Sequence, residues 1–164
     1  MKIPKRRRLE NKTDYRKRLK LLKGNKPRVL FRKSNRYIIS QYVESIEAQD
    51  FIKINVTSKD LLNYGWPKDF SGSLKSIPAS YLTGLLIGKK IIQARLETPI
   101  LDVGMIRMIN KNKVFAFLMG LKEAGVNINV SEEHFPEKER VEGKNLKEDF
   151  SKKFNEIKLK IEKV

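Results

Sequence analysis

The first regular pattern of apolar residues lies close to the start of the chain. Tyr15, Leu19 and Leu22 recur at the spacing of one helical face, and a glycine follows soon after as a stop signal. Thr13 or Asp14 can cap this segment. The pattern predicts a short helix with a narrow apolar stripe. This stripe must rest on another part of the molecule, because lysines and arginines fill the remaining surface.

After this segment the pattern becomes that of β-strands. The segments "RVLFRK" and "RYIISQYV" are rich in β-branched and aromatic residues, and Ser34 and Asn35 between them can form a tight turn. They predict two antiparallel strands. A third segment, "FIKINVT", alternates strictly, with Ile52, Ile54 and Val56 on one face. We expect this apolar face to meet helices.

Two longer segments have the spacing of amphipathic helices. Residues 76–96 begin with Ser76 and Pro78 in favourable N-terminal positions, and residues 113–125 form the second segment. Between them, "PILDVG" at 99–104 is typical of a short buried strand. The order βββαβα predicts an α/β fold. We expect a mixed sheet with helices packed on it, because the last strand should pair in parallel after a right-handed crossover.

Small residues recur at every fourth position of the first of these helices, at Ser80, Gly84 and Gly88. Such a stripe lets another backbone come close. We expect a helix or the sheet to pack there, with close approach of RNA as the alternative. The segment "GLLIGKK" is a poor match to a phosphate-binding loop, because only three residues separate its glycines and it lies within a helix.

Two further segments leave alternatives open. The loop "GWPKDFSGSLK" at 65–75 follows a short helix and is long for a plain connector, so it is a candidate for partner contact. Near the C-terminus, Asn145 and Glu148 resemble a capping box. An apolar stripe follows at Leu146, Phe150, Phe154, Ile157 and Ile161. This terminal helix either returns to the body, which we favour, or lies on a partner.

Charge is distributed very unevenly over the 164 residues, whose formal net charge is +17. Residues 1–36 contain 16 lysines and arginines but only two acidic residues. Residues 37–164 contain 20 lysines and arginines and 17 acidic residues. We therefore divide the chain into a basic N-terminal extension with a short helix at 1–26, an α/β core domain at 27–130, and an acidic loop with a C-terminal amphipathic helix at 131–164. A nearly neutral globule with a basic arm is typical of a protein that docks onto a polyanion.

Composition excludes several classes of protein. Without cysteine, no disulfide framework, thiolate nucleophile or cysteine zinc site is possible. The longest uncharged apolar stretch spans residues 76–88. A membrane-spanning helix needs roughly 20 residues, so we expect no membrane partner.

Candidate catalytic and metal-binding residues are few. His134 is the only histidine, and its neighbours Glu132, Glu133 and Glu137 form a weak signal for a metal site, so we expect a solvated or RNA-facing loop. A two-metal nuclease would need Asp102 to lie close to other carboxylates that bind the two metal ions. The candidates are Asp50, Asp60 and Glu97. Nothing in their spacing requires convergence, and an aspartate at a strand end more often caps a turn. We expect no catalytic residue, no metal and no cofactor.

Nucleic-acid binding remains as the function class. Arg28 and Arg32 lie on one face of the first strand and Tyr37 is available for stacking. The turn itself is crowded with Lys33, Ser34, Asn35 and Arg36. The tip can reach phosphates and unpaired bases, although a solvated basic surface is the simpler alternative. A chromosomal protein that compacts DNA would share the basic arm, but the hairpin tip suits irregular RNA better.

Five segments in order resemble one family, the archaeal and eukaryotic large-subunit ribosomal proteins that bind 5S rRNA, number eighteen in the universal ribosomal nomenclature. They are "RRRLENKTDYRKRLKLL", "PRVLFRKSNRYIISQ", "IPASYLTGLLIGKK", "LDVGMIRMINKNKVFAFLMGLKEAGVNI" and "FPEKERVEGKNL", and together they cover most of residues 6–146.

This resemblance implies a non-enzymatic component of the ribosome in the cytoplasm. It would bind 5S rRNA and help to attach it to 23S rRNA in the central protuberance, beside neighbouring ribosomal proteins. On the matching positions, the resemblance assigns RNA contact to Arg6, Arg7, Arg8, Lys12, Thr13, Tyr15, Arg16, Arg18, Arg32, Lys33, Ser34, Asn35 and Arg36.

The chain also departs from the family pattern. Relatives usually have a proline-histidine-serine sequence before the acidic loop, whereas this chain has "NINVS" at 127–131. The contact that the histidine makes in relatives is therefore not expected here. The terminal helix matches the family less clearly than the other segments do.

Overall fold

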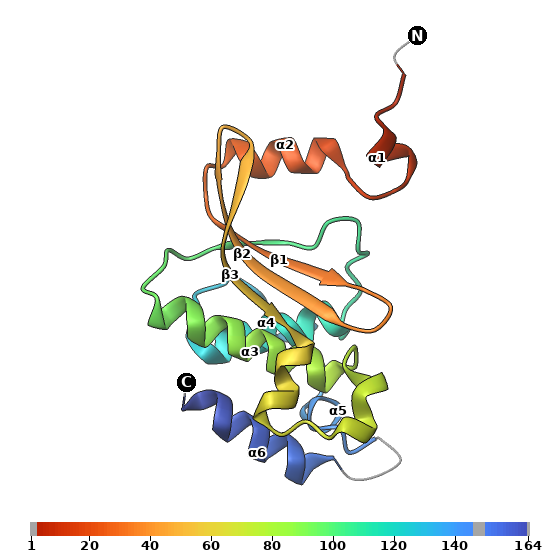
Figure 1. Ribbon diagram of the computed structural model, residues 1–164, viewed down its shortest axis with the longest axis vertical. Coiled ribbons are helices and arrows are strands. Elements are labelled where there is room, and N and C mark those ends of the chain that lie inside the picture. The colour runs from red at the N-terminus through yellow and green to blue at the C-terminus, as the bar shows by residue number, and fades with distance from the viewer. Residues whose placement is uncertain (1–2, 146–149, 164) are drawn as a thin grey trace.

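The computed structural model describes residues 3–145 and 150–163, which form an elongated molecule with the N-terminal arm at one end and the C-terminal helix at the other (Figure 1). The strands are β1 (Arg28–Lys33), β2 (Ile38–Ile46), β3 (Gln49–Thr57) and β4 (Ile100–Asp102). The helices are α1 (Arg6–Leu9), α2 (Tyr15–Lys23), α3 (Ile77–Gln93), α4 (Lys113–Ala124), α5 (Lys138–Glu142) and α6 (Ser151–Glu162). Three short 3-10 helices are η1 (Ser58–Tyr64), η2 (Lys68–Ser73) and η3 (Glu132–His134).

The four strands form one sheet in the order β3-β2-β1-β4. β1 pairs antiparallel with β2, and β2 pairs antiparallel with β3. β4 pairs with β1 in parallel, from Arg28 opposite Ile100 to Leu30 opposite Asp102. The predicted βββαβα order and the predicted mixed sheet are therefore confirmed, and the parallel pair brings Asp102 beside β1.

The third strand differs from its prediction at one end. Between Tyr42 and Val43 the register with β3 shifts, and Lys53 is the extra residue. A bulge of this kind breaks the alternation of a strand relative to its partner. Val56 is buried as expected, but Ile52 beyond the bulge is 54% exposed. The expectation that helices cover the whole apolar face of this strand is wrong.

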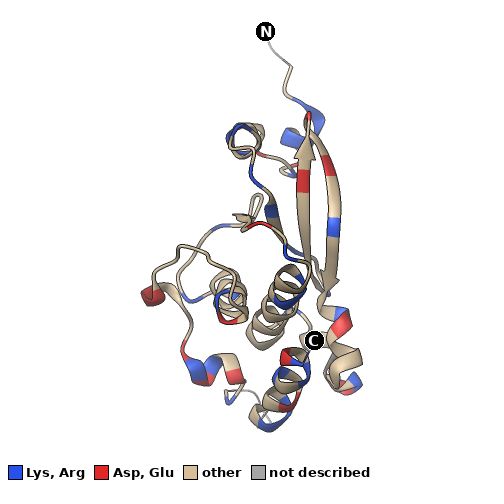
Figure 2. Cartoon of the chain, turned by 90° about the vertical axis from the view of Figure 1, so that its left-hand side faces the viewer, with Lys and Arg blue, Asp and Glu red and all other residues tan. Residues whose placement is uncertain are grey.

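Helices α3 and α4 pack closely against each other and lie on the same face of the sheet (Figure 2). A Cβ on Gly84 would overlap the carbonyl group of Phe117, and one on Gly120 would overlap that of Tyr81. The Ser80 Oγ donates a hydrogen bond to the carbonyl of Lys113 at 2.5 Å. The stripe of small residues thus serves helix packing, as expected, and not a phosphate-binding loop.

The C-terminal helix returns to the body. Phe154, Ile157 and Ile161 of α6 are buried in the same core as the sheet and α3. Phe150 is buried as well, and the ring of Trp66 lies 4.8 Å from it, so the segment 65–75 is anchored at its start by this contact. The predicted contributions of Leu146 and Glu148 lie outside the described residues. Helix α6 begins at Ser151 with Phe150 as its N-cap, and not at the predicted cap Asn145.

Candidate nucleic-acid interface

The basic arm contains two helices joined by a short turn. Asp14 caps α2, because its carboxylate accepts hydrogen bonds from the backbone amides of Arg16 at 3.0 Å and Lys17 at 3.1 Å. Thr13, the other predicted cap, instead accepts a hydrogen bond from Nε of Arg7 at 2.9 Å. That bond ties α1 to the start of α2 and fixes the course of the turn.

Other contacts within the arm are exposed and therefore weak. Glu10 lies 3.4 Å from Nε of Arg6 and 2.8 Å from Nζ of Lys12. The Lys5 ammonium group lies 4.6 Å from the ring centroid of Tyr15. Exposed ion pairs contribute about 0–1 kcal/mol each. These cations can therefore exchange their present partners for RNA phosphates at little cost.

Polar contacts hold α2 against the body, across the far end of the β2–β3 hairpin (Figure 1). The Lys17 Nζ donates to the carbonyl of Gly104 at 3.3 Å, and the Arg18 guanidinium pairs with Asp50 at 3.0 Å. No residue of α2 is buried, and Leu19 is 55% exposed. The helix itself is confirmed, but the expectation that its apolar stripe rests on the molecule is wrong at Leu19.

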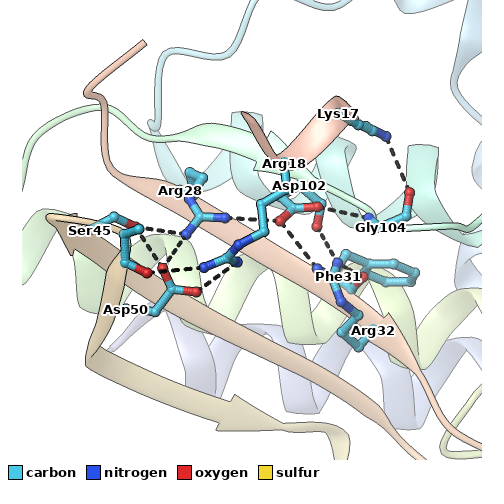
Figure 3. A network of polar contacts seen from close by, with 10 residues as sticks. Lys17, Arg18, Arg28, Phe31, Arg32, Ser45, Asp50, Asp102 and Gly104 are labelled. Carbon is cyan, nitrogen blue, oxygen red and sulfur yellow. Dashed lines mark hydrogen bonds and ion pairs between the residues drawn. The ribbon is translucent and has the colours of Figure 1, made fainter. Parts of the chain in front are cut away.

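Arg28 is the centre of a buried network (Figure 3). Its side chain is 1% exposed, and it reaches Asp102 at 3.2 Å and Asp50 at 2.7 Å. A third hydrogen bond at 2.8 Å goes to the Ser45 hydroxyl. Arg28 is therefore not available to RNA in this fold, and its prediction as part of the RNA-facing strand surface is wrong. Its role is to join β1 to β4 and to the β2–β3 hairpin.

Asp102 organises the other half of the network. Besides Arg28, it accepts a hydrogen bond from Arg32 at 3.2 Å and one from the backbone amide of Gly104 at 2.8 Å. Arg32 also donates to the Asp102 carbonyl at 2.7 Å, and its side chain remains 41% exposed. The aspartate therefore caps the turn after β4, as expected, while Arg32 is held in one position with part of its surface open.

Burial of Asp50 raises the pKa of its carboxyl group. Two kinds of interaction act in the opposite direction: hydrogen bonds from Arg18 and Ser45, and the positive charges of Arg28 and Arg18. Together they outweigh burial and lower the pKa below its ordinary value. Asp50 therefore stays ionised in the neutral range. It connects the buried Arg28 to Arg18 of the arm.

The β1–β2 turn is built around one serine. The Ser34 hydroxyl accepts hydrogen bonds from the backbone amides of Tyr37 at 2.8 Å and Arg36 at 3.3 Å, and it donates to the Tyr37 carbonyl at 2.9 Å. This local bonding fixes the turn. Lys33, Asn35 and Arg36 project from it as exposed side chains.

Four of the predicted contact residues are exposed cations whose side chains form no hydrogen bond or ion pair with any residue in the described part of the chain. They are Arg8, Arg16, Lys33 and Arg36. Lysine and arginine residues line α1 and α2 at one end of the molecule (Figure 2). The structure thus separates predicted residues with unused charge from those that hold the arm and the turn in place.

Two lysines near the hairpin were missed by sequence reasoning. Burial lowers the pKa of the Lys113 ammonium group, and the charges of Lys33 and Lys75 lower it further. The Ser80 hydrogen bond fixes the first turn of α4 against α3 and so brings Lys113 near Lys75. No local signal could have shown this cluster, because its members come from three distant segments.

The candidates for other chemistry have structural roles. Asp60 accepts a hydrogen bond from the backbone amide of Thr57 at 2.9 Å and caps η1. His134 lies half-buried, with its ring centroid 5.3 Å from that of Phe115, while its acidic neighbours Glu132, Glu133 and Glu137 are exposed, as the expected solvated loop requires. Within residues 3–145 and 150–163, no group of three or more acidic or histidine side chains could hold a metal ion. None of the helices described is long and apolar enough to cross a membrane.

Comparison with known proteins adds an independent observation. Residues 1–99 match the model of a family described as "Ribosomal large subunit proteins 60S L5, and 50S L18". The large ribosomal subunit protein uL18 of Korarchaeum cryptofilum (strain OPF8) is 40% identical over 145 residues, which are 88% of this chain and 72% of that protein. The matched region contains the arm, the β1–β2 hairpin and most of the ion-pair network.

Proposed function

Because the chain belongs to the family of large-subunit ribosomal proteins described as 60S L5 and 50S L18, we propose that it binds 5S rRNA and helps to attach it to 23S rRNA in the central protuberance. Family membership makes the protein a structural constituent of the ribosome in the cytoplasm and not an enzyme. Its partners as a member are ribosomal RNA and other ribosomal proteins. The identity of the RNA and the residues that contact it are the proposal.

The unused cations of the arm and the hairpin turn are the observation that carries this proposal. An exposed arginine without a carboxylate partner gains most from a phosphate, since no existing ion pair has to be broken and each neutralised phosphate releases counterions. Direct RNA contact is therefore proposed first for Arg8, Arg16, Lys33, Asn35 and Arg36.

The remaining predicted residues divide into two groups by their present contacts. One group has weak, exposed contacts that RNA can replace, namely Arg6, Lys12 and Tyr15. The second group fixes the arm and the hairpin and contacts RNA with the part of its surface that stays open, namely Arg7, Thr13, Arg18, Arg32 and Ser34.

We also propose that the three segments of the chain have different tasks. Residues 1–26 supply the charge that lies between RNA segments, and residues 27–130 present the hairpin on a rigid α/β core. Residues 131–164 complete the core from the opposite end through α6. Binding energy then comes from positioning and counterion release, with no bond made or broken.

A salt titration of RNA binding tests the electrostatic mechanism. If roughly ten phosphates are contacted, the plot of log affinity against log salt concentration should have a slope of about −7 to −9. Filter binding of labelled 5S rRNA to the full chain measures it. A slope near zero would contradict the proposal.

Competition distinguishes 5S rRNA from other polyanions. At one fixed salt concentration, unlabelled 5S rRNA should displace the labelled RNA at much lower concentration than duplex DNA or a fully paired RNA duplex of equal length. Equal displacement by duplex DNA would favour a DNA-compacting protein, and the proposed specificity would then be wrong.

A further inference from the structure

A cavity of about 400 Å³ opens beside the β1–β2 turn. Its volume lies in the range of about 300–1,000 Å³ that is typical of ligand pockets. The walls come from the turn, from η1 and from the segment 65–75. The lining residues are Asn35, Arg36, Tyr37, Lys59, Leu62, Gly72 and Leu74.

Tyr37 gives this cavity an aromatic wall held in a fixed place. Its backbone amide and carbonyl both bond to the Ser34 hydroxyl, at 2.8 Å and 2.9 Å, so the turn fixes the backbone that carries the ring, and the ring itself packs against the core. Leu74 is 1% exposed and belongs to the core, and Leu62 packs against the core. The floor is therefore apolar and rigid.

The charged groups at the rim are all positive. The Lys59 ammonium group lies 4.8 Å from the centroid of the Tyr37 ring, and Arg36 is exposed and without an ion pair within the described chain. No acidic residue lines the cavity. An aromatic wall with an apolar floor suits a flat ring, and a cationic rim without carboxylates suits an anion attached to it.

We propose that this cavity binds one unpaired nucleotide of the RNA, with its base stacked on Tyr37 and its phosphate held by Arg36 and Lys59. The inference rests on the proposed function, because it names a contact within the RNA interface. Stacking of a base on an aromatic ring is stronger than an exposed cation–π contact, so the base displaces the Lys59 ammonium group from the ring. The displaced ammonium group then reaches the phosphate of the same nucleotide.

The same proposal gives the segment 65–75 a role. Gly72 forms part of the wall, and a Cβ built on it meets no atom within 4 Å. A side chain at this position therefore extends into open space without strain in the backbone. Because Gly72 lines the cavity, a bulky side chain at this position narrows the cavity and leaves every charge of the protein unchanged.

The test compares Gly72→Leu, which narrows the cavity, with Gly72→Ala as the matched control, and uses Tyr37→Leu as a second variant that removes the ring. Affinity is measured for an archaeal 5S rRNA transcript and for a fully paired RNA duplex. Loss of one stacked base should weaken 5S rRNA binding roughly 5- to 100-fold for Gly72→Leu and Tyr37→Leu. Gly72→Ala adds only one methyl group to the wall and should weaken 5S rRNA binding much less than Gly72→Leu does, and duplex binding should not change for any variant.

A cross-linking experiment locates the contact. With 5S rRNA transcribed with 4-thiouridine, irradiation should attach RNA to the tryptic peptide of residues 37–53, which begins at Tyr37. Gly72→Leu should abolish this cross-link while cross-links to the arm remain.

The two possible failures can be told apart. If the unaltered protein does not prefer 5S rRNA to duplex RNA, the proposed function itself is wrong. If it does, and folded Gly72→Leu and Tyr37→Leu bind 5S rRNA as tightly and cross-link at residues 37–53 as efficiently as the control, only the nucleotide cavity is overturned.

Discussion

Arg28 and Arg36 stand at opposite ends of β1 and its turn, and their surroundings determine opposite roles. Arg28 is enclosed by Asp102, Asp50 and Ser45, and its charge is fully used inside the protein. Arg36 is exposed and its side chain has no partner within the described residues. Stability should therefore depend on Arg28, and RNA binding should depend on Arg36.

Replacing Arg28 with methionine should destabilise the protein by about 3–5 kcal/mol. The substitution keeps an unbranched side chain of similar length but leaves the nearly buried Asp102 with less compensation for its charge. Urea unfolding monitored by circular dichroism measures the loss.

Arg36→Met is the matched control at an exposed position. It should change the free energy of unfolding by no more than about 0.5 kcal/mol. It should also reduce the magnitude of the slope of log affinity for 5S rRNA against log salt concentration by about 1. If Arg28→Met proved as stable as Arg36→Met, the buried ion pairs of Arg28 would not be what joins β1 to β4 and to the β2–β3 hairpin.

At the scale of elements, the contact between α2 and the β2–β3 hairpin depends on few groups. Arg18 reaches both the carboxylate of Asp50 and the carbonyl of Ala48, at 3.0 Å and 3.4 Å. With no buried residue in α2, these bonds and that of Lys17 determine where the arm lies. The orientation of the arm should therefore respond to the charge of Asp50.

The contribution of Asp50 to stability should depend on pH. Its pKa is lowered in the folded protein from the ordinary value of 3.8, so its ionised form stabilises the fold. At pH values above the ordinary pKa of 3.8, the unaltered protein should be more stable than Asp50→Asn by the full amount. This difference in stability should decrease as the pH falls below that value through the folded pKa.

Urea midpoints measured from pH 7 downwards test this dependence. Asp69→Asn is the control, because Asp69 is exposed and forms no ion pair among the described residues. The stability difference for that control should stay close to zero at every pH. If the stability difference between the unaltered protein and Asp50→Asn increased as the pH fell, the predicted sign of the pH dependence would be wrong.

The sequence was sufficient to predict the strands and the longer helices, because these follow from local periodicity and capping. It did not predict α1, α5, η2 or η3, because each is too short to show a periodic pattern. The bulge at Lys53 and the burial of Arg28 could not be predicted in this way. Each depends on pairing between segments: Asp102 stands 74 residues from Arg28 in the chain, and Asp50 stands 22 residues away. The cavity beside Tyr37 depends likewise on three segments that meet only in the fold.

For the molecule as a whole, charge and apolar burial are concentrated at different ends. The core extends from the sheet through α3 and α4 to α6, while the cations of α1 and α2 lie at the opposite end (Figures 1 and 2). The uneven distribution of charge was evident from the sequence, because it is a property of composition along the chain. The packing of Phe150 against Trp66 and of α6 against Tyr81 was not evident, because an apolar stripe does not identify the surface that covers it.

Deleting residues 1–26 should leave a folded domain with a much weaker dependence of RNA binding on salt. Six of the nine cations proposed to contact RNA lie in this arm, so the steepness of the salt dependence should fall by roughly two-thirds. The lost contacts of Lys17 and Arg18 are partly exposed, and their loss should lower the free energy of unfolding by about 1–2 kcal/mol.

The control is the full-length chain with Arg6, Arg7 and Arg8 changed to glutamine. Its salt dependence should fall between those of the unaltered and the truncated protein, and it should unfold like the unaltered protein. A truncated protein that lost cooperative unfolding would show that the arm is a structural element of the domain. A truncated protein with an unchanged salt dependence would show that the hairpin and the core bind the RNA without it.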